Sequence, residues 1–155
     1  MRSKIVLGFS VVSVFAGLAF AQEDDFDPEP VIAGRQAALR EIGAAFKGIT
    51  DELRKSQPAV ALIRQYAQQI DDLAKQQHLW FPPGTGPESE IETAAKPEIW
   101  QQPAEFKAGQ AAMTEHAAKL VQVAAGNDIK AIRTQWQALG RTCKSCHDKF
   151  REEDD

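Results

Sequence analysis

Residues 139–152 read LGRTCKSCHDKFRE, and this stretch decides how the rest of the chain is interpreted. It holds Cys143, Cys146 and His147 in a C-x-x-C-H pattern. Side chains three and four positions apart share one face of an α-helix, so a helix here turns both thiols and the imidazole to one side. Two such thiols can form thioether bonds to the vinyl groups of one haem, and the adjacent imidazole can bind its iron. The stretch therefore predicts one covalently bound haem c with His147 as a metal ligand.

Three other interpretations of the motif are weaker. A zinc site needs about four ligands, whereas the sequence offers only His78 and His116 as further histidines and no second cysteine pair. A redox-active dithiol usually opens a helix in a strand-rich domain, and no strand pattern is visible. A helix with an incidental disulfide leaves His147 without a role. Covalent haem is the favoured interpretation.

Apolar residues at alternating intervals of three and four precede the motif and predict amphipathic helices. The expected helices span residues 30–56, 58–79 and 103–126, followed by a fourth that is capped by Asn127 or Asp128 and reaches Phe150. Residues 80–102 are rich in proline and glycine and predict one long loop. The expected fold is all-α, an antiparallel four-helix bundle with a long connection between its second and third helices and the haem motif on the last.

The same spacing predicts which side chains face the core. These are Leu39, Ile42, Phe46, Ile49 and Leu53; Val60, Ile63, Ala67, Ile70 and Leu73; Phe106, Met113, Ala117, Leu120 and Ala124; and Ile129, Ile132, Trp136, Leu139, Cys143, Cys146 and Phe150.

The N-terminus has the composition of a secretory signal peptide. Residues 1–21 begin with the basic Arg2 and Lys4, continue as an apolar run and end in an A-x-A site at Ala19 and Ala21. Cleavage is expected after Ala21, because the apolar run is too short for a membrane anchor. The mature domain, residues 22–155, is then expected in the periplasm without a membrane attachment, where thiols are oxidised or covalently used.

Length and composition fit one soluble domain. The chain has 155 residues, 43% of them hydrophobic and 26% charged, which is ordinary for a globular protein. Its formal net charge is −4 and it has no basic stretch, so nucleic acid is not an expected partner.

Several strings together resemble the cytochrome c′ family, the class II c-type cytochromes. Besides C-x-x-C-H near the C-terminus of a four-helix chain, they are FPPGTG at 81–86, KPEIW at 96–100 and Arg35-Gln36 early in the first helix. The resemblance covers nearly all of the mature chain. It implies a haem c protein that forms a homodimer through its first two helices.

The resemblance also implies the surroundings of the iron. Leu39 matches the position on the distal side, opposite His147, where low-spin members of the family carry methionine. Leucine cannot bind iron, so the implied iron is five-coordinate and high-spin beneath an apolar pocket that uncharged NO or CO can enter. Judged by spacing alone, Leu39 is core filler. The only methionine of the mature chain is Met113.

Further residues gain roles from the resemblance. Arg35 would meet a haem propionate with Gln36 as its companion, although from the residues alone a solvated surface arginine is an equal interpretation. Glu92 and Thr93 would line the haem edge from the loop. Arg151 would cover the proximal face beside His147; alternatively, it is an arginine favoured by the helix dipole.

The expected function is non-enzymatic. The protein would carry single electrons to or from an unidentified periplasmic redox partner, bind NO or CO, or do both. One alternative is a low-spin, six-coordinate carrier with Met113 or His116 on the iron. Another is a haem enzyme such as a peroxidase, against which Leu39 counts because it supplies no acid–base group.

Overall fold

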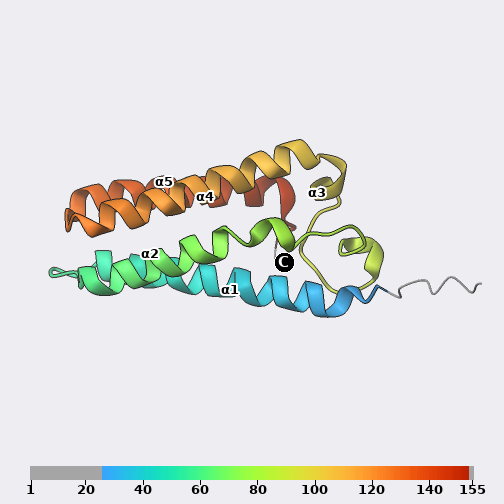
Figure 1. Ribbon diagram of the computed structural model, residues 1–155, viewed down its shortest axis with the longest axis horizontal. Helices are drawn as coiled ribbons and strands as arrows, with labels where there is room; N and C mark the ends of the chain where they lie inside the picture. The colour runs from blue at the N-terminus through green and yellow to red at the C-terminus, as the bar shows by residue number, and fades with distance from the viewer. Residues whose placement is uncertain (1–25, 154–155) are drawn as a thin grey trace, which may run out of the picture.

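The computed structural model describes residues 26–153, which fold into an antiparallel bundle of long helices (Figure 1). The long helices are α1 (Pro28–Leu53), α2 (Val60–Ala74), α4 (Pro103–Ala125) and α5 (Ile129–Phe150). The predicted all-α four-helix bundle with a long second connection is confirmed. The predicted signal peptide, residues 1–21, lies outside the described residues.

Each long helix packs on its neighbour in the sequence. α1 lies against α2, α2 against α4 and α4 against α5, whereas α1 and α5 share few contacts. Figure 1 shows the α1–α2 and α4–α5 connections at one end of the bundle. The connection from α2 to α4 lies at the other end, where α1 begins and α5 finishes. The first and last helices also meet directly, because the rings of Phe46 and Trp136 stack with their centres 5.3 Å apart.

Two apolar clusters hold the molecule together. The main cluster draws on all four long helices and contains Ile49, Ile63, Leu120 and Leu139, all fully buried. A smaller second cluster joins the connection between α2 and α4 to the ends of α4 and α5; its buried members are Ala95, Ile99, Phe106 and Phe150. Removal of this apolar surface from water is the main stabilising contribution to the fold.

The prediction that Leu39 is a core residue is wrong for this structure. Its side chain is 40% exposed, although Ile42, the next predicted position, is buried. Leu39 lies in the first half of α1 and does not belong to the main cluster, which takes its α1 residues from Ile42 onward.

The first connection begins earlier than the sequence predicts. α1 ends at Leu53 instead of near residue 56, and α2 begins at Val60 instead of at Pro58. The reason is a local hydrogen bond, because the N–H of Ala59 donates to the carboxylate of Glu52 over 2.9 Å. This bond holds Ala59 outside the helix as its N-cap residue.

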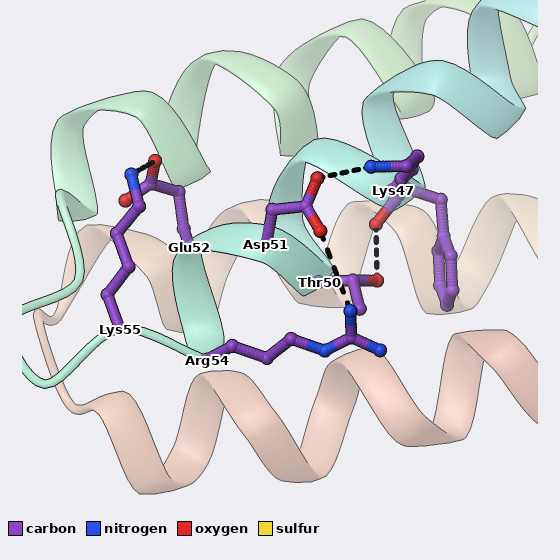
Figure 2. Close-up of polar contacts among 7 residues, drawn as sticks. Lys47, Thr50, Asp51, Glu52, Arg54 and Lys55 are labelled. Carbon is purple, nitrogen blue, oxygen red and sulfur yellow. Dashed lines mark hydrogen bonds and ion pairs between the residues drawn. The ribbon is translucent and has the colours of Figure 1, made fainter.

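Charged side chains cover the same end of α1 (Figure 2). Lys47 and Arg54 both pair with Asp51, and Lys55 pairs with the buried Glu52. The pairs of Asp51 are solvent-exposed and contribute little, whereas Glu52 also satisfies a backbone donor.

The other helix ends show how caps set boundaries. α1 begins at Pro28, two residues before the prediction, because Asp27 accepts a hydrogen bond from the N–H of Glu29. α5 begins after Asp128, whose carboxylate accepts the N–H groups of Lys130 and Ala131. Of the two predicted caps of this helix, Asp128 is the one observed.

The connection after α2 is more regular than predicted. α2 ends at Ala74, not near residue 79, and a 3₁₀ turn follows at Gln77–Leu79. The predicted loop 80–102 contains a second 3₁₀ turn, Pro87–Ser89, and the short helix α3, Glu98–Gln101. Within residues 26–153, no helix combines the length and the apolar character that a bilayer span needs.

Candidate functional site

The motif residues lie together near the end of α5. Cys143, Cys146 and His147 belong to one unbroken helical stretch, so the predicted common face is present. Both thiols are free. Cys143 packs against the main cluster and Cys146 against the second cluster. The motif therefore sits where the two apolar clusters meet.

Burial favours the neutral forms of all three side chains of the motif. Burial raises the pKa of the Cys143 and Cys146 thiols, and each thiol keeps its proton at neutral pH. Loss of hydration lowers the pKa of His147, the positive charge of Arg151 lowers it further, and Asp148 acts in the opposite direction. His147 is therefore an uncharged imidazole with a lone pair available to a metal.

Aromatic rings form the wall beside Cys146. The ring of Phe106, on α4, lies 4.8 Å from Phe81 and 5.2 Å from Phe150, both in edge-to-face contact. A groove of about 470 Å³ runs along α4 and α5, with Gly109, Cys146 and Phe150 among its lining residues. Cys146 thus borders both an apolar wall and an open surface.

Arg35 is the most constrained of the predicted site residues. It is 2% exposed, so the solvated-arginine interpretation is wrong. Its two terminal nitrogens donate to the Thr85 hydroxyl (3.1 Å), the Thr85 carbonyl (3.0 Å), the Thr93 hydroxyl (2.9 Å) and the Trp80 carbonyl (3.3 Å). The guanidinium also lies 4.7 Å from the centre of the Phe81 ring.

The neighbouring predicted residues gather around it. The Gln36 side chain donates to the backbone carbonyl of Glu92 over 3.0 Å, next to the Thr93 contact of Arg35. Arg35, Gln36, Glu92 and Thr93 are therefore brought together from α1 and the long connection. Leu39 follows one turn later on the same helix and is partly open to solvent.

Arg151 ends α5 and joins it to the long connection. Its N–H donates to the carbonyl of His147, which closes the last turn of the helix. Arg151 forms an isolated β-bridge with Ala95, and the N–H groups of Lys96 and Glu152 donate across it over 3.0 Å and 2.8 Å. The proximal-face role of its side chain stays a prediction.

One member of this region was missed by the sequence reasoning. Thr85 is fully buried, accepts from Arg35 and donates its hydroxyl to the Pro82 carbonyl over 2.8 Å. In the sequence it looks like an ordinary turn residue inside FPPGTG. Its role becomes visible only in the folded chain, where the buried guanidinium of Arg35, on α1, donates to it.

The alternative ligands are engaged in contacts of their own. Met113 packs against the main cluster. His116 lines the groove along α4 and α5, and its Nδ1 is 3.1 Å from the Gln135 side-chain amide. His78 is exposed, next to the carbonyl of Lys75. Among residues 26–153, no three His, Cys, Asp or Glu side chains are grouped so that they could hold a metal ion.

Comparison with known proteins agrees with this arrangement. The family described as Cytochrome C′ matches residues 30–151. The cytochrome c′ of Pararhodospirillum photometricum is 31% identical over 125 residues, which are 81% of this chain and 98% of that protein. The chain therefore belongs to the cytochrome c′ family.

Solved structures show the same fold. A cytochrome c′ described as having an unusual ligand-controlled dimer dissociation aligns with a TM-score of 0.77 and 27% identity, over 83% of this chain and 98% of that one. A nitric oxide complex of a variant cytochrome c′ from Alcaligenes xylosoxidans aligns with a TM-score of 0.73 and 29% identity, over 82% and 98% of the two chains.

The residues present fit the cofactor of the family, haem c. Its attachment needs two reduced cysteines and a neutral imidazole on one helical face, and Cys143, Cys146 and His147 supply them. The apolar clusters on either side suit a flat, largely apolar ring.

Proposed function

We propose that this protein is a periplasmic c-type cytochrome whose haem is bonded to Cys143 and Cys146 and ligated by His147. The observation that carries the proposal is the position of these three residues at the end of α5, between two apolar clusters. When bound, the haem supplies an iron that exchanges single electrons and binds small gases. The two sulfurs anchor the ring, and the uncharged imidazole holds the iron from one side.

We infer a five-coordinate, high-spin iron from the character of Leu39. This side chain is the distal residue in the family register, and a hydrocarbon offers neither a ligand atom nor a hydrogen bond. Distal polarity and access decide which ligand an iron binds, so an apolar pocket of this kind favours NO and CO.

We expect the remaining predicted residues to lie around the haem. Glu92 and Thr93 lie in the long connection next to Gln36 and Arg35, and we place the haem edge beside them. Arg151 would cover the proximal side, because its charge already acts on His147. This arrangement leaves no acid–base group at Leu39, so we propose electron transfer or gas binding rather than catalytic turnover.

The low-spin alternative has less support. Met113 is engaged in the main cluster, and His116 lines the groove along α4 and α5, with its Nδ1 beside Gln135. Either residue would have to leave these contacts to serve as a sixth ligand, and the loss of its present packing or hydrogen bond would oppose that movement.

Export and assembly complete the proposal. We propose that residues 1–21 direct export and that cleavage follows Ala21, so the mature protein functions in the periplasm with an unidentified redox partner.

We also propose a homodimer through α1 and α2, supported by a solved relative described by the dissociation of its dimer. Sedimentation of the holoprotein at micromolar concentration should give twice the monomer mass; a monomer at all concentrations would contradict this.

Two measurements on exported protein test the central claim. Mass spectrometry should show the mature chain with one added haem mass. Absorption spectra should show high-spin ferric and ferrous forms, with a shift of the ferrous spectrum under CO. A chain without the added mass would overturn the haem assignment, and a ferrous spectrum unchanged by CO would overturn the open coordination site.

A further inference from the structure

Arg35 has four hydrogen bonds to the connecting segment, which we define as residues 80–96. All four run from its two terminal nitrogens to Trp80, Thr85 and Thr93. The ring of Phe81, in the same segment, lies 4.7 Å from the guanidinium. A fork of donors that spans two well-separated parts of one segment is a property of arginine and not of lysine. The guanidinium thus acts on the segment itself.

The far end of the connecting segment is tied to the end of α5. The N–H of Lys96 donates to Phe150, and the N–H of Glu152 donates to Ala94. Aromatic contacts run in parallel, because Phe81 meets Phe106 and Phe106 meets Phe150. At the end of the bundle where α5 finishes, this segment therefore connects α1 to the helix of Cys143 and His147. Direct contacts between α1 and α5, such as the stacking of Phe46 on Trp136, lie further from that end.

We propose that Arg35 is a positioning residue of the haem site, which holds the connecting segment between α1 and the end of α5 and so fixes the spacing of Leu39 and His147. This inference rests on the proposed function, because it concerns the two sides of the same iron. This role is additional to the propionate contact that the family resemblance implies, and it depends on the forked geometry of the donors.

The first test separates geometry from charge. Arg35→Lys keeps the charge and loses the fork, whereas Arg35→Gln loses both. We expect both ferrous holoproteins to bind CO about fivefold faster than the wild type, because the loss of these hydrogen bonds loosens α1 over the iron. The measurement is CO association by flash photolysis. A wild-type rate in Arg35→Lys together with a changed rate in Arg35→Gln would overturn the proposal in favour of a charge role.

The second test acts at the other end of the segment and avoids the buried core. Glu152→Pro removes the N–H that donates to Ala94, and the extended backbone of Arg151 tolerates a following proline. We expect the same acceleration of CO binding in Glu152→Pro. Adding Arg35→Lys should give no further acceleration, because both changes break the same connection from α1 through the segment to the end of α5. Glu153→Pro, one residue beyond the bridge, is the control and should keep the wild-type rate.

The two proposals fail in different ways. If the wild-type protein carries no haem, or if its ferrous form does not bind CO, the proposed function is wrong. If the wild type binds CO and Glu152→Pro binds it at the same rate, the proposed function stands and the positioning role of the connecting segment is wrong. Helicity and the melting temperature, measured on each variant, identify a variant that has lost the fold. If the Arg35 variants do not fold, the CO-binding rate of Glu152→Pro alone tests the positioning role.

Discussion

Leu39 is the residue on which the coordination of the iron depends in our proposal. A methionine at this position would bring a thioether sulfur, which binds haem iron as an axial ligand. We expect Leu39→Met to convert the ferric spectrum from high-spin to low-spin and to slow CO binding to the ferrous form.

The control for this variant is Met113→Leu, a substitution that conserves volume and removes the only native methionine of the mature chain. It should leave the spectrum high-spin. A wild-type spectrum that is low-spin and becomes high-spin in Met113→Leu would show that Met113, not an open site, completes the coordination of the iron.

Two glycines of α1 differ in the space around them. A Cβ at Gly43 would meet no atom within 4 Å, whereas a Cβ at Gly48 would lie 2.6 Å from the Tyr66 ring. Alanine is favoured over glycine inside a helix by about 0.5–1 kcal/mol. We expect Gly43→Ala to raise the free energy of unfolding by about that amount, and Gly48→Ala to lose the gain because the ring must move. Equal denaturation midpoints for the two variants would contradict this.

At the scale of elements, the start of α5 depends on one carboxylate. Asp128 accepts two backbone N–H groups, from Lys130 and Ala131. Loss of such a cap costs about 1 kcal/mol, so Asp128→Ala should lower stability by that amount in urea unfolding. Asp128→Asn keeps an acceptor oxygen and is the matched control; a loss equal to that of the alanine variant would mean that charge, not capping, is the contribution.

Helices could be predicted from the sequence wherever one face stays apolar over several turns. α4 and α5 begin where Pro103 and Asp128 predict, because these signals act within a few residues. The end of α1 and the start of α2 could not be predicted, since they depend on the hydrogen bond between Ala59 and Glu52 across a turn. Leu39 shows the other limit: a periodic pattern marks a face but does not say what lies opposite it.

The same distinction holds for the site. C-x-x-C-H is local, so helical geometry alone brings Cys143, Cys146 and His147 together. Arg35 and Thr85 are 50 residues apart in the chain, and nothing in either neighbourhood indicates that one will satisfy the other. A buried arginine needs acceptors, but its partners become visible only when the chain is folded.

At the scale of the whole molecule, stability should depend on the protonation of Glu52. Hydrogen bonds from Lys55 and from the Ala59 N–H lower the pKa of this carboxyl below its usual value. A lowered pKa in the folded state stabilises the fold above the unfolded-state pKa, and this contribution is lost as the pH falls through the folded-state pKa. The melting temperature should therefore fall as the solution is acidified below about pH 4.

The variant Glu52→Gln isolates this effect. It should be less stable than the wild type at neutral pH, and the difference should shrink in acid, where the wild-type carboxyl is protonated as well. Glu41→Gln changes an exposed glutamate of the same helix and should follow the wild-type curve. A difference between Glu52→Gln and the wild type that is independent of pH would rule out the carboxylate as its source.

The order of the helices along the chain has a consequence for the order of folding. Pairs of helices adjacent in the sequence have short loops to close and assemble quickly, whereas contacts between distant segments form slowly. The hairpins α1–α2 and α4–α5 are of the first kind, and the pairing of Ala95 with Arg151 is of the second. We therefore expect the pairing of Ala95 with Arg151, next to the end of α5 that carries Cys143 and Cys146, to form last.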